Sequence, residues 1–281
     1  MARSQRKPLA FETPGFDKWL KEVAAMPAEQ QIEVVVKKLQ ELNPKFDGKF
    51  SGVGDVLIKE GVVAGFSFCT NFVTDISPIR AFTHLKSLGC LGARFDGQDG
   101  QLSDLAPLKG MELLSLNFSY NQVTDITPLM GMPLVYLSCY YNPMSNLSPL
   151  RNMPLESIHL EGTKVADLSP LSGMTKLRGI WLGRTKVTDL SVLTGMPLQA
   201  LWIFETQVTD LTPLRGMSLY TLSIQSSQVT DLSVLKDMPL IDLQLDFTPE
   251  RDTELLRSIK TLNTINSKPA ADFWKEVDEK K

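Results

Sequence analysis

The chain has 281 residues, of which 43% are hydrophobic and 22% are charged, and its formal net charge is −3. This composition is ample for a packed core and excludes a mainly disordered chain. A near-neutral charge supplies no large positive field, so a general nucleic-acid binder is also excluded. Three cysteines do not make a disulfide framework.

Targeting and membrane signals are the next class to consider. No apolar run approaches the roughly 20 residues that a transmembrane helix needs. Arg3, Arg6 and Lys7 are not followed by an apolar run, so no secretory signal is expected. We therefore expect a cytoplasmic protein in a reducing compartment.

The first 61 residues predict a tail and a helical cap. Residues 1–14 are expected to be a flexible tail. Residues 15–61 are predicted to form the cap: apolar residues at helical spacing over 16–23 and again over 32–42 indicate two amphipathic helices. The Gly-rich stretch between residues 47 and 61 predicts a hairpin that leads into the next segment.

A repeat occupies residues 62–248. A five-residue phrase such as DLTPL or DLSVL recurs with steps of 29, 21, 21, 21, 22, 21 and 21 residues. It starts at Asp75, Asp104, Asp125, Asn146, Asp167, Asp189, Asp210 and Asp231. Such a strict period indicates one supersecondary unit stacked on itself.

Each repeat predicts a strand and a turn. Apolar residues lie 12, 9 and 7 positions before the Asp, with the L-x-x-L-x-L spacing of a short strand. The Asp is expected to be the N-cap of a helical turn, with Pro in its first turn, a left-handed Gly at its end and a Met in the core behind it.

The remaining segment, residues 249–281, predicts a C-terminal cap. Pro249 stops the pattern, and residues 250–260 and 271–277 each show helical spacing of apolar residues. The two segments therefore close the stack with helices, as a repeat array requires at its ends.

The repeat pattern L-x-x-L-x-L-x-x-[N/T]-x-V-x-D resembles the leucine-rich repeat, and its short convex segment is most similar to the class shared by bacterial internalins and a regulatory subunit of protein phosphatase 1. The resemblance implies an α/β solenoid with a parallel concave sheet, short helical or 3-10 turns on the convex side, and helical caps. The terminal phrases WLKEVAAMPAEQQ and PAADFWKEVDE also resemble modules attached to some bacterial serine/threonine kinases, although no kinase motif is present.

Strand residues that point away from the core do not need aromatic side chains for the protein to fold. In the centre of the array these positions nevertheless hold aromatic side chains flanked by charges, with Trp181 and Trp202 expected face to face on adjacent strands. The predicted partner-binding residues are Tyr136, Tyr140, His159, Glu161, Trp181, Arg184, Trp202, Phe204 and Glu205.

Central aromatic residues with a polar surround are typical of protein-binding hot spots. We therefore expect a bacterial, non-enzymatic, monomeric module that binds a protein or extended peptide on the concave face, with no nucleic acid, membrane or cofactor. Four alternatives stay open. The rings merely cover the sheet, or they form a carbohydrate or peptide platform. The chain is otherwise a regulatory module of a bacterial kinase or phosphatase signalling system that uses its caps, or a purely structural spacer.

Other chemical sites find little support in the sequence. A triad around His159 has no defined geometry, the glycines Gly52 and Gly54 lack the remainder of a phosphate loop, and the Gly92–Gln101 insertion lacks EF-hand spacing. Cys90 and Cys139 are expected in the core, and Cys69 at an exposed strand position. We therefore predict no catalytic residue and no metal site.

Overall fold

A computed structural model describes residues 8–48, 55–92 and 100–279. Residues 1–7 of the expected tail, Gly52 and Gly54, and residues 93–99 of the insertion lie outside these ranges. The chain forms two compact units, which are Met1–Leu134 with Asn142–Met144, and Val135–Tyr141 with Ser145–Lys281.

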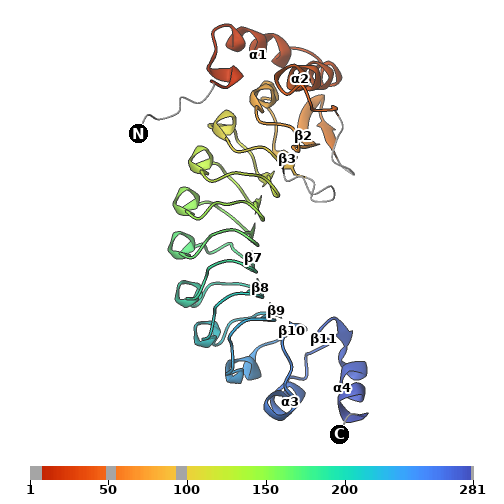
Figure 1. Ribbon diagram of the computed structural model, residues 1–281, viewed down its shortest axis with the longest axis vertical. Helices are drawn as coiled ribbons and strands as arrows, with labels where there is room; N and C mark the ends of the chain where they lie inside the picture. Colours follow the sequence, from red (N-terminus) through yellow and green to blue (C-terminus); the bar gives the residue numbers. More distant parts are fainter. Residues whose placement is uncertain (1–7, 49–54, 93–99, 280–281) are drawn as a thin grey trace. The chain divides into compact units, whose positions relative to one another are not determined.

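The first unit begins with helices and continues with the first coils of the repeat (Figure 1). Strand β1 is antiparallel to β2, and β2, β3 and β4 pair in parallel. The elements are the 3-10 turn η1 (Ala10–Glu12), α1 (Phe16–Ala24), α2 (Ala28–Leu42), β1 (Val56–Lys59), β2 (Val62–Cys69), η2 (Ser77–Ala81), β3 (Ser87–Leu91), η3 (Ala106–Leu108), β4 (Ser115–Asn117) and η4 (Thr127–Leu129).

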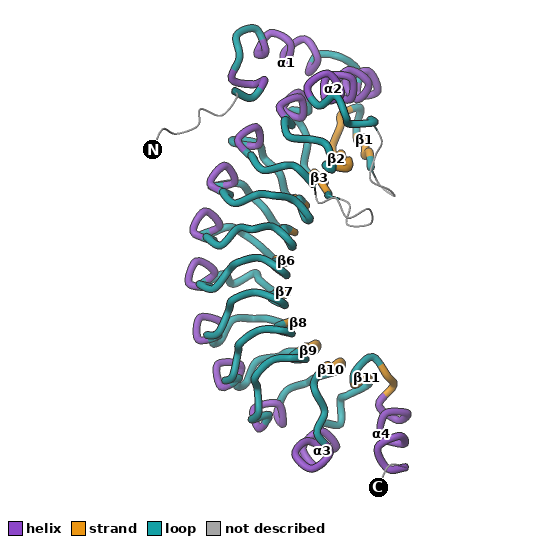
Figure 2. Tube along the Cα trace, in the orientation of Figure 1, coloured by secondary structure: helices purple, strands orange, loops and turns teal. Residues whose placement is uncertain are grey.

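The second unit alternates very short strands with very short turns, so that loops make up most of each coil (Figure 2). Its repeat elements are β5 (Tyr136–Ser138), η5 (Ser148–Leu150), β6 (Ser157–His159), η6 (Ser169–Leu171), β7 (Gly179–Trp181), η7 (Ser191–Leu193), β8 (Ala200–Trp202), η8 (Thr212–Leu214), β9 (Thr221–Ser223), η9 (Ser233–Asp237) and β10 (Asp242–Gln244). Its closing elements are α3 (Pro249–Ser258), β11 (Thr264–Ile265), β12 (Lys268–Pro269) and α4 (Ala270–Glu279).

Neighbouring strands from β5 to β11 pair in parallel, and β12 turns back antiparallel to β11. Strands line one side of this unit and the 3-10 turns line the other (Figure 1). The expected leucine-rich-repeat solenoid, with its parallel sheet, 3-10 turns and helical caps, is confirmed.

The core is a ladder of equivalent apolar residues. The central residue of each three-residue repeat strand of the second unit is fully buried against the same residue of the next coil, because side chains alternate between the two faces of a strand. This ladder in the second unit consists of Leu137, Ile158, Ile180, Leu201, Leu222 and Leu243, all with 0% exposure. Of the methionines that follow the turns, Met111 is half-buried, and the others, Met132, Met153, Met174, Met196, Met217 and Met238, are buried as expected.

The turn differs in one detail from the prediction. The Asp lies one residue before the N-cap, and its Oδ1 accepts the backbone N–H two residues on, as from Ser191 to Asp189 at 2.7 Å. The helix therefore starts one residue later than expected, because Asp closes an Asx turn instead of capping the helix itself. Left-handed residues end most of these turns, with φ of 79° at Gly110 and 62° at Asn152.

Candidate functional site

The sheet face of the second unit, meaning the strand residues that point away from the core and the outward residues just after each strand, carries a stack of three rings. Strand register places His159 beside Trp181 and Trp181 beside Trp202. The ring centroids of His159 and Trp181 are 3.8 Å apart at an interplanar angle of 14°, and those of Trp181 and Trp202 are 4.1 Å apart at 10°. The expected face-to-face arrangement of the two indoles is therefore present.

Two tyrosines adjoin the histidine end of this stack. The Tyr136 ring lies 5.2 Å from the His159 ring, tilted by 57°, and the Tyr140 ring lies 6.5 Å from it, tilted by 38°. Both come from the β5 coil, one strand before His159. Five rings from four successive coils are thus in one continuous aromatic cluster.

Glycines make room for the rings. A Cβ at Gly179 would lie 2.7 Å from Cζ3 of Trp181, and a Cβ at Gly183 would lie 2.4 Å from two carbons of the Phe204 ring. Any larger residue at these positions forces the ring to move, since real Cβ contacts are not this close. The two glycines therefore define where Trp181 and Phe204 lie.

The orientation of Trp181 decides which part of the indole a partner meets. The edge that carries Cζ3 lies over Gly179, and Nε1 is on the opposite edge of the indole. Within the described ranges neither Trp181 nor Trp202 donates a hydrogen bond through Nε1, and neither nitrogen is a buried atom without a partner. Both N–H groups therefore reach solvent, while stacking covers both faces of Trp181 and one face of Trp202.

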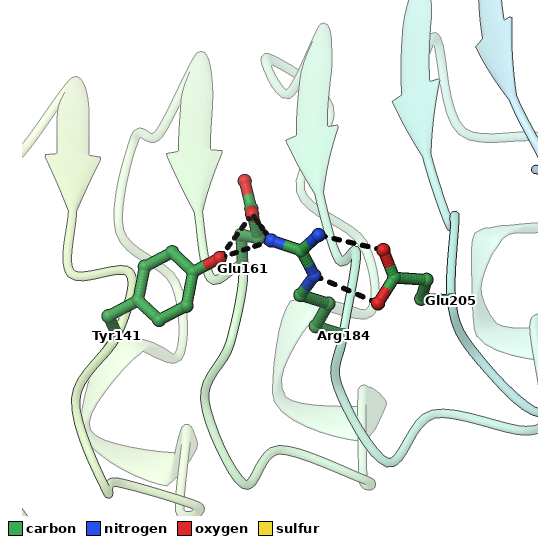
Figure 3. Close-up of polar contacts among 4 residues, drawn as sticks. All are labelled: Tyr141, Glu161, Arg184 and Glu205. Carbon is green, nitrogen blue, oxygen red and sulfur yellow. Dashed lines mark hydrogen bonds and ion pairs between the residues drawn. The ribbon is translucent and has the colours of Figure 1, made fainter.

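Four polar side chains from successive coils, those of Tyr141, Glu161, Arg184 and Glu205, contact one another in a row (Figure 3). Arg184 donates from Nε and Nη2 to the two carboxylate oxygens of Glu205 at 2.9 and 2.7 Å. Its Nη1 donates to Oη of Tyr141 and, at 3.3 Å, to Oε1 of Glu161. The Tyr141 hydroxyl in turn donates to the same Oε1 at 2.9 Å. We call these four residues the polar strip.

Backbone geometry places the polar strip at one end of the strands. Tyr141, Arg184 and Glu205 occupy the same position in three coils and have left-handed φ values of 53°, 57° and 51°. Their N–H groups continue the parallel ladder onto the next coil, as from Arg184 to the Phe204 carbonyl at 3.0 Å. Left-handed backbone costs a non-glycine residue about 1–2 kcal/mol, so the repeat geometry over-determines these positions.

The environment shifts the pKa values of His159, Arg184 and Glu205. Burial lowers the pKa of His159 to about 4, so its imidazole is neutral at pH 7. Hydrogen bonds to Glu205 and Tyr141 raise the pKa of Arg184 above its ordinary value. Hydrogen bonding from Arg184 holds the pKa of Glu205 below its ordinary value. The Arg184–Glu205 pair is therefore ionised across the physiological range.

All nine predicted contact residues lie in the second unit, in four successive coils. Trp181, Trp202, His159, Phe204, Tyr136, Tyr140 and Glu161 are half-buried, and Arg184 and Glu205 are exposed. Tyr141 was absent from the predicted set although it links Glu161 to Arg184. Tyr141 lies five residues before the first residue of the repeated phrase, and Arg184 and Glu205 occupy the same position in their own repeats. This shared position is the signal that identifies Tyr141.

Other reactive groups lie elsewhere. Cys90 and Cys139 are fully buried, and burial raises the pKa of both thiols. Cys69 is only half-buried. In the described part of the chain no three His, Cys, Asp or Glu side chains gather as metal ligands would. None of the described helices combines the length and the apolar character needed to cross a membrane.

Comparison with known proteins identifies the fold. No protein-family model and no curated protein matches the chain. Among solved structures, internalin C2 from Listeria monocytogenes is 23% identical with a TM-score of 0.60, over 79% of this chain and 98% of that chain. A structure of PEPR1–AtPEP1 is 13% identical with a TM-score of 0.56, over 82% of this chain and 37% of that chain.

A plant ice-binding protein is a further structural match, 13% identical with a TM-score of 0.55 over 85% of each chain. At these identities the likeness concerns the fold. The protein therefore has the fold of an internalin-like leucine-rich repeat protein.

Proposed function

We propose that this protein is a non-enzymatic binding module that holds a protein or extended peptide on the sheet face of its second unit, the side expected from the sequence to be concave. The observation that carries the proposal is the stack of His159, Trp181 and Trp202 on a face where folding requires no rings. Aromatic clusters that keep contact with solvent are a common signature of interaction sites.

Preorganisation supports this role. Stacking and the glycines under the rings hold the side chains in place before a partner arrives, and each rotamer-rich side chain ordered in advance avoids about 0.5–1.5 kcal/mol of binding entropy. The stacked arrangement also narrows the alternatives. A carbohydrate platform needs an open ring face, whereas here stacking at 3.8 and 4.1 Å covers both faces of Trp181 and one face of Trp202.

The proposal is tested by replacing Trp181 and Trp202 together with alanine. We expect an intact fold and a loss of binding of about 2 kcal/mol or more, because anchor residues of this kind dominate interface energies. Tyr220→Ala is the matched control, since Tyr220 is an aromatic residue of the same unit, 42% exposed, outside the aromatic cluster. Quantitative affinity capture from cell extract compares the three proteins.

Recovery of the same partners by the double variant would contradict the proposal. The folded state of each variant is checked by chemical denaturation, so that loss of binding is separated from loss of structure. Turnover of any substrate that disappears with His159→Ala would instead favour catalysis.

A second candidate is a regulatory module of a bacterial kinase or phosphatase system that uses its caps. In this second candidate, the caps are residues 15–61 and 249–281, which flank the repeat array of residues 62–248. A hollow of about 280 Å³ at the C-terminal cap, lined in part by Phe247, Phe273 and Val277, favours it. Val277→Arg would then abolish binding while the tryptophan variant keeps it. A monomeric state, a cytoplasmic location and the absence of a cofactor remain predictions.

A further inference from the structure

The polar strip carries two carboxylates and one guanidinium, so one negative charge in it has no counterpart. Resting on the proposed function, we propose that the sheet face selects partners that present a lysine or arginine side chain, which pairs with Glu161 beside the ring stack. The argument concerns which hydrogen-bonding groups of the polar strip are already used and which remain for a partner.

Arg184 is already committed to its neighbours. Its guanidinium makes four hydrogen bonds, two to Glu205, one to Tyr141 and one to Glu161. An arginine has only five N–H donors, and the bidentate contact with Glu205 is the stronger kind of charged pair. Arg184 therefore positions the two carboxylates and has little capacity to receive an anionic group from a partner.

Glu161 has acceptor capacity left. Its Oε1 receives both the Tyr141 hydroxyl and Nη1 of Arg184. Its Oε2 receives no hydrogen bond from any described residue and points away from the other three side chains (Figure 3). A carboxylate accepts about four hydrogen bonds, so Oε2 of the half-buried Glu161 is a fixed acceptor that favours a charged donor.

The sheet face around Glu161 also carries a net negative charge. On the described sheet face of β5–β10, the acids are Glu161, Glu205, Asp242 and Asp246 and the sole cation is Arg184, so one positive and four negative charges sum to −3. Lys164 and Lys186 lie nearby in sequence, but neither forms an ion pair with Glu161 or Glu205 in the described structure. A face of this sign attracts cationic segments and repels anionic ones.

The ring stack complements a cationic side chain in a second way. Glu161 follows His159 by two positions on the same side of the chain, so a lysine or arginine head at Glu161 brings its aliphatic stem against the rings. The solvent-facing indole N–H groups are donors, and they are available to main-chain carbonyls of the same segment.

The test uses a random peptide library displayed on phage, selected against the whole protein. Selections run in parallel on wild type, Glu161→Gln, Trp181→Ala with Trp202→Ala, and the Tyr220→Ala control. Glutamine keeps a carbonyl oxygen for Tyr141 and Arg184 but removes the charge, so Glu161→Gln is expected to fold with an unchanged denaturation midpoint.

We expect peptides enriched on wild type to share a lysine or arginine. A synthetic peptide with that residue replaced by glutamine should bind wild type about tenfold more weakly. Against Glu161→Gln the same replacement should cost almost nothing, because the pair is already broken.

Two outcomes overturn the inference in different ways. If enriched peptides depend on Trp181 and Trp202 but share no basic residue, or bind Glu161→Gln equally well, the cationic preference is wrong and the proposed function stands. If no enriched peptide depends on the two tryptophans, the proposed function fails and this inference fails with it.

Discussion

At the scale of single residues, His159 shows how the stack changes chemistry. Trp181 covers one face of the imidazole at 3.8 Å, and the resulting burial disfavours the charged form. Interaction between a cation and the indole face acts in the opposite direction. A direct measurement of the His159 pKa therefore reports which effect is larger.

We expect NMR titration to give a His159 pKa near the value of about 4 that burial produces. Trp181→Ala should raise this pKa towards the ordinary value of about 6.5, because it re-exposes the ring. A His84→Asn variant assigns the two histidine signals. A pKa above 6.5 in the wild type would show that attraction to the indole outweighs burial.

The sign of the linked stability effect follows from this pKa. The unfolded chain binds a proton at His159 more readily than the folded chain, so the contribution to stability is complete above about pH 6.5 and declines as the pH falls towards 4. His159 therefore contributes its full share of the folding stability at neutral pH, where the imidazole is uncharged.

At the scale of the coil, the buried polar residue that follows each strand bonds to the backbone in one of two ways. Asn142 accepts the Val123 N–H at 2.9 Å and donates to the Phe118 carbonyl at 3.0 Å, so it joins its own coil to the preceding one. Thr185 donates at 2.6 Å to the Leu182 carbonyl of its own coil only. Replacing Asn by Thr thus loses the link between coils.

This difference predicts unequal costs in chemical denaturation. Asn142→Ala should destabilise the protein by about 2–4 kcal/mol, because two buried backbone groups lose their partners. Thr185→Val should cost only about 1 kcal/mol, since a single hydrogen bond is removed at nearly constant volume. Equal losses would indicate that the asparagine link between coils has no special weight.

At the scale of the whole molecule, each coil buries its apolar side only on its neighbours, so the ends need cover. In the second unit the last repeat strand, β10, is followed by α3, β11, β12 and α4. Ile265 of β11 pairs with Leu243 of β10, and both side chains have 0% exposure. The cap therefore extends the core instead of merely covering it.

Deleting residues 249–281 should leave Leu243 and Leu245 at an open end of the core. We expect binding of a hydrophobic dye, self-association and a lower denaturation midpoint for the shortened protein. Deleting only residues 280–281, which follow α4, is the control and should change none of these. If the shortened protein had the same denaturation midpoint as the full-length protein, the repeats would need no C-terminal cap.

Much of this architecture was predictable, because each repeat carries its own strand, turn and core residues. The spacing from Leu137 to Ile158 and onward indicated the ladder directly, and the outward position of Trp181 followed from alternation along a strand. The start of each turn was misjudged by one residue, since an aspartate supports an Asx turn as readily as a helix cap.

The periodic sequence by itself determined the coil, the core and which side chains face outward, because a repeat that buries its apolar side on identical neighbours has a single consistent register. Only the tertiary structure decided how those outward side chains combine. Contacts such as Arg184 with Tyr141, 43 residues apart, depend on rotamers and ring positions across several coils. A residue pattern records those neighbours separately and contains no direct information about their mutual geometry.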